Sequence, residues 1–106
     1  MRVDHRGHLD LLLLTALEAG PAHGYAVIER IRHLSQGVFD LAEGTVYPAL
    51  HRLEGEGMLQ SRWSDEAPRP RRVYSLTRRG RAAVGERTES WLRFARGMAA
   101  ALEGTT

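Results

Sequence analysis

The sequence predicts a mainly α-helical fold with one small β-hairpin. Apolar residues recur with helical spacing in three segments before residue 57, and two segments between residues 58 and 76 alternate apolar and polar residues as strands do. A longer helical pattern fills the rest of the chain. The 106 residues are 42% hydrophobic and 26% charged, which is typical of one globular unit and not of a disordered chain.

Three short helices are expected in the first half of the chain, over residues 9–19, 24–34 and 44–56. The first is apolar nearly all round, so burial on several sides is expected. The third contains Pro48. Because proline fits a helix comfortably only in its first turn, the beginning of this third helix is expected to be irregular.

The second helix is expected to place Tyr25, Ile28 and Ile31 in the core, with Val27 as a further candidate, and Arg30 in water. This assignment follows from the helical period, which decides which side chains share a face. His23 immediately precedes the helix, and a structural role at the helix end is expected for it.

The two strand segments cover residues 58–64 and 72–76. They are joined by a stretch with two prolines and mixed charge, which predicts a hairpin. Trp63, on the first strand, is expected to pack the hairpin onto the core. Thr77 follows the second strand and is expected to be the N-cap of a last helix that reaches about residue 102.

This order of elements, three helices followed by a hairpin and a long helix, predicts a winged helix-turn-helix. In that arrangement the second helix of the helix-turn-helix enters the major groove of double-stranded DNA, and its solvent-side residues contact the bases. Here the corresponding helix spans residues 44–56. Its outward residues are the candidate DNA contacts: Thr45, Tyr47, Pro48, His51 and Arg52.

Positive charge gathers in the second part of the chain. Residues 1–61 hold five Arg and eight acidic residues, whereas residues 62–106 hold ten Arg and five acidic residues. Six of these Arg lie between residues 69 and 81, where there is no acid. Cations on a wing beside a recognition helix suit contact with phosphates, although a solvated face without a partner is the alternative interpretation. The candidate phosphate contacts are Arg69, Arg71 and Arg72.

The last helix carries apolar residues every three, four or seven positions, the spacing of a coiled-coil seam. We therefore expect a DNA-binding domain over residues 1–78, a dimerisation helix over residues 79–106, and a homodimer. The predicted seam residues are Val84, Trp91, Phe94, Ala95, Met98 and Leu102. Trp91 is expected to pack in the seam. The alternative, that Trp91 contributes to a pocket for a small-molecule effector between subunits, stays open.

Several kinds of chemistry are not expected. The chain has no cysteine, which excludes disulfides, thiolate zinc sites and cysteine nucleophiles. It has neither a Gly-rich phosphate loop nor a serine nucleophile motif, so no enzymatic activity and no cofactor are expected. His5 and His8 have a spacing that metal ligands use, but without cysteine or paired carboxylates no metal site is expected. The apolar stretch 9–17 is too short to cross a bilayer, and we expect a cytoplasmic protein without membrane contact.

Three blocks of sequence are specific in their order and spacing. Residues 21–25 read Pro-Ala-His-Gly-Tyr and open the second helix. Residues 43–59 begin Glu-Gly-Thr-Val-Tyr-Pro-Ala-Leu and cover the third helix up to the hairpin. Residues 71–81 read Arg-Arg-Val-Tyr-Ser-Leu-Thr-Arg-Arg-Gly-Arg and close the hairpin. Together they resemble the PadR family of bacterial transcriptional regulators, over about residues 9–102.

The resemblance implies a winged-helix repressor of the short branch, which dimerises through a single C-terminal helix and binds inverted-repeat operators. It also implies that Tyr47 lies near the DNA backbone with Thr45 and Pro48 as its neighbours, and that Tyr74 is the wing tyrosine of the DNA-binding surface. One departure is Ala42, where many members carry Ser or a similar cap. The N-cap of the third helix is therefore expected to be weaker by about 1 kcal/mol.

Three functions are considered at this point, and the third, a small-molecule-binding protein or an enzyme, would need observed turnover to support it. The main hypothesis is a sequence-specific homodimeric repressor that a small-molecule effector releases from DNA. The alternative is a winged helix that serves as a protein-interaction module without specific DNA binding. A DNA-binding protein loses affinity steeply as salt rises, because its cations displace condensed counterions, so salt dependence separates the two.

Overall fold

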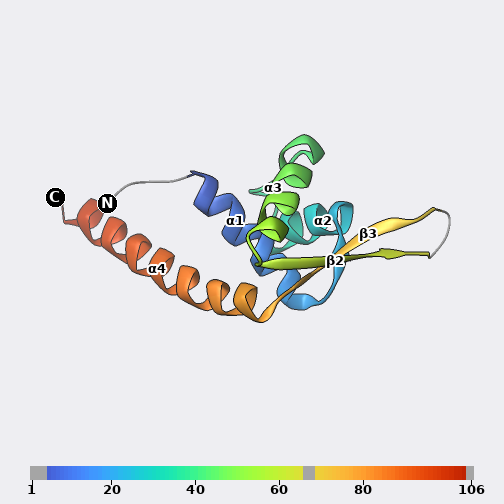
Figure 1. Cartoon of the computed structure of the whole chain (residues 1–106). Helices are drawn as coiled ribbons and strands as arrows, with labels where there is room; N and C mark the ends of the chain where they lie inside the picture. Colours follow the sequence, from blue (N-terminus) through green and yellow to red (C-terminus); the bar gives the residue numbers. More distant parts are fainter. Residues whose placement is uncertain (1–4, 66–68, 105–106) are drawn as a thin grey trace.

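The computed structural model describes residues 5–65 and 69–104. Its elements are α1 (His5–Ala16), the 3₁₀ helix η1 (Leu17–Ala19), β1 (Ala22–His23), α2 (Gly24–Leu34), α3 (Glu43–Gly55), β2 (Leu59–Ser64), β3 (Arg71–Leu76) and α4 (Arg78–Glu103). In Figure 1 the three short helices form the body, β2 and β3 project from it as a wing, and α4 runs away in the opposite direction. The predicted mainly α-helical winged helix-turn-helix is confirmed. Within the described ranges, no helix is long and apolar enough to span a membrane.

The hydrophobic core lies where α1, α2 and α3 meet the inner ends of β2 and β3. Its largest fully buried side chains are Tyr74, Leu13, Leu14, Ile31, Leu50, Leu53, Val27 and Val46. The prediction that Tyr25 also lies in the core is wrong, because its side chain is exposed. Val27, the further candidate for this face, lies four residues before Ile31 and is fully buried.

The sheet has three antiparallel strands in the order β1–β3–β2. β2 and β3 form the predicted hairpin, in which Trp63 lies opposite Arg72. The sequence did not indicate β1, because a strand of two residues is too short to show alternation. Its Ala22 pairs with Tyr74 of β3, and this pairing fixes the beginning of α2 beside the wing.

Arg30 of α2 closes the turn after α1, whereas the sequence placed it in water. Its Nη1 donates to the backbone oxygens of Ala16 (3.2 Å) and Gly20 (2.7 Å), and its Nη2 donates to that of Pro21 (3.3 Å). Backbone oxygens at a helix end lack partners within the helix, so the guanidinium supplies them. Gly20 adopts a φ of 129° in this turn, a conformation that favours glycine.

α3 carries Pro48 inside a continuous helix, so the irregular beginning predicted from this residue is wrong. Ala42 occupies the N-cap position and has no side-chain acceptor, as the sequence predicted. At the other end Gly57 adopts a φ of 80°, and the amide of Met58 donates to the oxygen of Leu53 at 3.0 Å. This bonding pattern ends the helix and turns the chain into β2.

α4 is fixed firmly at the point where the wing ends. Oγ1 of Thr77 accepts a hydrogen bond from the amide of Gly80 at 3.0 Å, which confirms Thr77 as the N-cap. The same hydroxyl donates to the backbone oxygen of Gly57 at 2.6 Å. Gly80 packs so closely on Met58 that a Cβ atom at position 80 would overlap the Met58 backbone oxygen.

The first turns of α4 belong to the core, and the rest of the helix leaves it. Val84 is only 5% exposed within a single chain. Its predicted place in a dimer seam is therefore corrected: it packs inside its own protomer. The other predicted seam residues lie further along α4 and are exposed or half-buried: Trp91, Phe94, Ala95, Met98 and Leu102.

Candidate nucleic-acid interface

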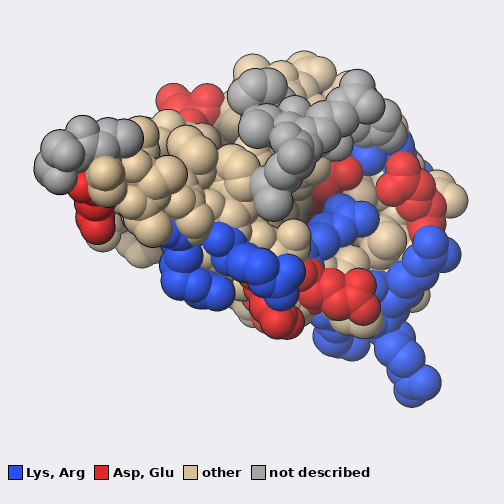
Figure 2. Space-filling model, turned by 90° about the vertical axis from the view of Figure 1, so that its left-hand side faces the viewer, with Lys and Arg blue, Asp and Glu red and all other residues tan. Residues whose placement is uncertain are grey.

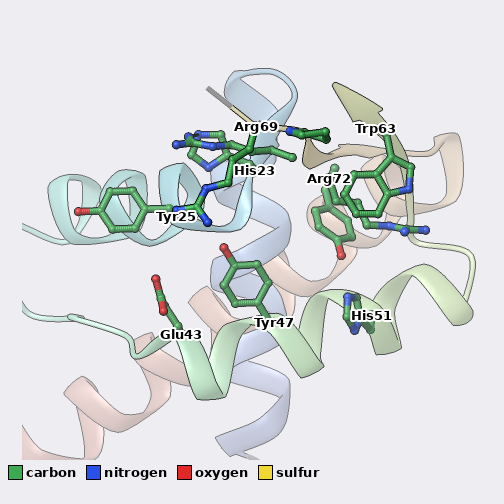
Figure 3. A pocket seen from close by; sticks show the side chains of 11 residues that line it. His23, Tyr25, Glu43, Tyr47, His51, Trp63, Arg69 and Arg72 are labelled. Atoms are coloured by element: carbon green, nitrogen blue, oxygen red, sulfur yellow. Dashed lines mark hydrogen bonds between the residues drawn. The ribbon is translucent and has the colours of Figure 1, made fainter. Parts of the chain in front are cut away.

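A groove of about 650 Å³ lies between the wing, the start of α2 and the outer face of α3. Figure 3 shows side chains from all three elements converging on it. Aromatic rings form much of its wall, and arginines of the wing form one rim. The lining residues are His23, Tyr25, Glu43, Tyr47, His51, Trp63, Arg69, Pro70, Arg71, Arg72 and Tyr74.

The outer face of α3 presents most of the side chains predicted for it. Thr45, Pro48 and His51 are exposed, and Tyr47 is half-buried. Figure 3 shows Tyr47 rising from α3 into the groove, and His51, further along the same helix, also lines it. The Tyr47 ring lies against the start of α2, where a Cβ atom added to Gly24 would come within 2.5 Å of its Cε1 atom. Glycine at position 24 therefore makes room for the tyrosine ring.

Arg52 does not share this outer face, which corrects the predicted set. Its two terminal nitrogens donate to both carboxylate oxygens of Asp10 in α1, with 3.0 Å between Nη1 and Oδ2. A second carboxylate, that of Glu56, lies 3.5 Å from Nη1. The hydrogen bonds to Asp10 are the main cause that raises the pKa of Arg52 above its usual value. Arg52 thus fixes α3 to α1 and points away from the groove.

Trp63 and Arg72 face each other across the strands of the wing. The guanidinium carbon of Arg72 lies 5.3 Å from the centre of the indole ring, and its Nε donates to Oγ of Ser61 at 2.8 Å. Ser61 in turn donates to Oε2 of Glu54 in α3 at 2.6 Å. Trp63 is 62% exposed, so its predicted packing onto the core is wrong. The core ends two strand pairs earlier, where Ser61 lies opposite Tyr74.

His23 connects the start of α2 to the wing. Its Nδ1 accepts a hydrogen bond from the amide of Ala26 at 3.3 Å and so caps α2, in agreement with the predicted helix-end role. Its Nε2 lies 2.8 Å from Nη1 of Arg71. Burial lowers the pKa of His23, and the charges of Arg71 and Arg30 lower it further, so the ring is neutral near pH 7.

Tyr74 closes the inner end of the groove. Its side chain is 1% exposed, and its hydroxyl has no hydrogen-bond partner among the described residues. Burial is the main cause that raises the pKa of this phenol, and the charge of Glu54 adds to it. The ring lies 6.3 Å from that of His51, centre to centre. This burial conflicts with a DNA contact through Tyr74 and corrects the prediction that Tyr74 belongs to the DNA-binding surface.

Positive charge surrounds the outer part of the groove. Its lining includes the predicted Arg69, Arg71 and Arg72 beside one carboxylate, that of Glu43. Three more arginines are exposed at the start of α4, outside the groove lining: Arg78, Arg79 and Arg81. Such a surface suits an extended polyanion, with α3 supplying hydrogen-bonding groups between the cations. The described parts of the chain hold no group of three or more His, Asp or Glu residues that could bind a metal ion.

Five groove residues were not among the predicted contacts: His23, Tyr25, Glu43, Trp63 and Pro70. For His23 and Tyr25 the available signal is the Pro-Ala-His-Gly-Tyr block at residues 21–25, which opens the helix that precedes the recognition helix. For Trp63 the signal is weaker, because strand alternation shows which face a residue occupies and does not show where the core ends.

The fold and this groove define a winged helix-turn-helix protein with a cationic wing. The sequence model of the PadR-like family of transcriptional regulators matches residues 13–86, and the chain belongs to this family. The family is one of transcriptional regulators and not of enzymes.

Three known proteins illustrate the relationship. The chain is 37% identical to Transcriptional regulator Rv3488 of Mycobacterium tuberculosis over 86 residues, which are 81% of this chain and 78% of the relative. A PadR family transcriptional regulator from Eggerthella lenta is similar in structure with a TM-score of 0.80 and 33% identity, over 95% of this chain and 86% of that one. Bacillus subtilis PadR, solved in complex with operator DNA, has the same fold with a TM-score of 0.68 and 22% identity, over 80% of this chain and 46% of that one.

Proposed function

We propose that the chain is a transcriptional repressor that binds double-stranded DNA through α3 and the wing. The observation that carries this proposal is the groove in which the exposed face of α3 lies beside the arginines of the wing. In such an arrangement α3 enters the major groove and the wing contacts the backbone. The operator complex of Bacillus subtilis PadR, which has the same fold, supports it. The proposed contacts are Thr45, Tyr47, Pro48, His51, Arg69, Arg71 and Arg72.

The proposal includes a homodimer formed through α4. Trp91, Met98 and Leu102 are large apolar side chains that are exposed in a single chain. Figure 2 looks onto the end of the molecule that carries the C-terminal part of α4, and it shows a continuous uncharged surface above a band of charged side chains. Covering this surface with a second copy would remove apolar area from water. Two copies related by a two-fold axis would match an inverted-repeat operator.

The proposal also includes repression of transcription and release of the protein from DNA by a small-molecule effector. Trp91 lies where α4 leaves the body, and its ring is edge-on to that of His8 in α1 at 6.4 Å between centres. A small molecule that binds beside Trp91 in a dimer would change how the two α4 helices pack. Because α4 is joined directly to the wing, this change would alter the spacing of the two recognition helices. A regulator of this kind acts on DNA in the cytoplasm.

DNA binding is tested by measuring affinity for a duplex from the promoter of the chain's own gene over a range of salt concentrations. The logarithm of the affinity should fall linearly with the logarithm of salt, with a slope of about −0.9 for each phosphate contacted. His51→Ala should weaken binding to the promoter by about 1–3 kcal/mol and binding to a mixed-sequence duplex by less. An affinity that salt does not change would instead favour a protein-interaction module.

The dimer is tested by sedimentation at micromolar concentration. Met98→Glu places a charge on the exposed apolar face of α4 and is expected to produce monomers. Arg93→Ala is the matched control, because Arg93 is exposed on α4 outside the seam spacing, where it pairs with Glu89 at 3.4 Å. A monomeric unsubstituted chain would contradict this part of the proposal.

A further inference from the structure

The inner face of the wing continues from the core into the groove. Leu59 lies opposite Leu76 in the core, and the next pair on the same face is Ser61 with the buried Tyr74. The pair after that is Trp63 with Arg72. Because alternate residues of a strand share a face, this last pair extends the inner face beyond the body. Figure 3 shows Trp63 and Arg72 side by side, across the groove from His51.

Arg72 is held in one orientation by its neighbours. Its Nε donates to Ser61, its guanidinium carbon lies over the indole of Trp63, and Oε1 of Glu54 lies 3.9 Å from Nε. Among the described residues these hydrogen-bond and ion-pair contacts all use Nε, which leaves the terminal nitrogens to meet another acceptor. A guanidinium oriented in advance loses less side-chain entropy when it binds an anion.

Trp63 presents a large apolar surface beside this cation. Arg72 lies over its ring, and the side chain is still 62% exposed. The DNA backbone offers complementary groups, because each deoxyribose can pack on a flat apolar surface while the adjoining phosphate binds a guanidinium. Tryptophan and arginine are also the residues that most often dominate binding energy at interfaces.

We propose that Trp63 and Arg72 act as one contact to the DNA backbone, in which the indole packs on a deoxyribose and the guanidinium binds the adjoining phosphate. This inference rests on the proposed DNA binding and adds Trp63 to the contact surface. A backbone contact carries no sequence information, so its loss weakens binding to every duplex alike. That property separates it from the base contacts expected of His51.

The test uses the full chain and a mixed-sequence duplex of about 30 base pairs, enough for two half-sites. Trp63→Ala is expected to weaken binding about tenfold, with an equal change on the promoter duplex, and Trp63→Phe is expected to lie between. Arg72→Ala should reduce the salt slope by about one. Arg62→Ala is the matched control. The substitution removes the same charge as Arg72→Ala, but Arg62 is exposed and lies on the opposite face of β2. Circular dichroism checks the fold of each variant.

A second readout follows the tryptophan itself. The chain has two tryptophans, so the emission of the unsubstituted protein minus that of Trp63→Phe reports Trp63. DNA is expected to protect this signal from quenching by acrylamide. Unchanged affinity of Trp63→Ala, an unprotected Trp63 signal, or an equal slope change in Arg62→Ala would overturn the inference and leave the proposed function standing. No binding of either duplex by the unsubstituted chain at low salt would overturn both.

Discussion

The carboxylate of Asp10 accepts hydrogen bonds from both terminal nitrogens of Arg52, which lies 42 residues further along the chain. Asp10 is 6% exposed, and Nη1 of Arg87 in α4 lies 3.9 Å from its Oδ2. This carboxylate therefore joins α1, α3 and α4 at one point. It is a buried charge whose cost of dehydration is offset by two cations.

Replacing Asp10 with Ala should lower the free energy of unfolding by about 3 kcal/mol, because Arg52 then keeps a partly buried charge without its main partner. Urea denaturation measures this change. Glu29→Ala removes the exposed pair of Glu29 with Arg32 and should cost less than about 1 kcal/mol. Equal losses of unfolding free energy in the two variants would show that the Asp10–Arg52 pair stabilises the fold no more than an exposed ion pair does.

Removing the buried hydroxyl of Tyr74 should not harm the fold. Tyr74→Phe is expected to leave the free energy of unfolding unchanged or to raise it by up to about 1 kcal/mol, since the hydroxyl has no partner among the described residues. The raised pKa of Tyr74 means that the native state retains this proton above pH 10, so stability from this group is lost as pH rises further. The variant should unfold with a weaker dependence on pH there. A loss of more than 1 kcal/mol at pH 7 would indicate a bonded hydroxyl.

Acid should weaken the beginning of α2 through His23. Its pKa is lowered in the folded protein, so the unfolded chain binds the proton more readily, and stability falls as pH drops below the ordinary value of 6.5. Protonation also removes the acceptor for the amide of Ala26 and sets a charge beside Arg71. His23→Asn retains a capping acceptor without titrating and should show a smaller loss between pH 7.5 and pH 5.5 in thermal unfolding. Parallel losses in both proteins would assign the effect to other groups.

Gly24 and Gly55 provide a matched pair of helical glycines. A Cβ atom at Gly24 would meet the ring of Tyr47, whereas one at Gly55 meets no described atom within 4 Å. Gly55→Ala should therefore raise the free energy of unfolding by about 0.5–1 kcal/mol. Gly24→Ala should displace the Tyr47 ring and weaken DNA binding, as measured by anisotropy of a labelled duplex. Normal DNA affinity in Gly24→Ala would mean that the position of this ring does not matter for binding.

The sequence correctly predicted those helices and caps that depend only on residues close together in the chain. α2 spans the predicted residues, and Thr77 caps α4, because apolar period and capping chemistry act over a few neighbouring residues. Contacts between distant segments were not predictable in this way. Arg52 lies on a polar stretch of its helix and looks solvent-facing until the fold brings Asp10 beside it. Arg30 likewise finds its acceptors at Ala16 and Gly20 only once α1 and α2 are packed.

The extent of the core was the other unpredictable quantity. Trp63 and Val84 both belong to regular apolar patterns, and the period of a pattern shows which face a residue occupies. It does not show where the neighbouring elements end. Val84 lies inside that limit and is core, whereas Trp63 lies two strand pairs outside it and is exposed. For this reason Trp63 lines the candidate site, although the sequence placed it in the core.

The junction at Thr77 gives the molecule the mechanics of a lever. α4 has 26 residues and forms a rod on the order of 39 Å long at the rise of an α-helix. At the wing its end is clamped, because Thr77 is bonded to both Gly57 and Gly80 and the backbone of Gly80 touches that of Met58. A tilt imposed on the C-terminal end of α4 could not be absorbed by bending at this junction. The wing would rotate with the helix, and in the proposed homodimer a small change in the angle between the two α4 helices would become a large change in the distance between the two wings.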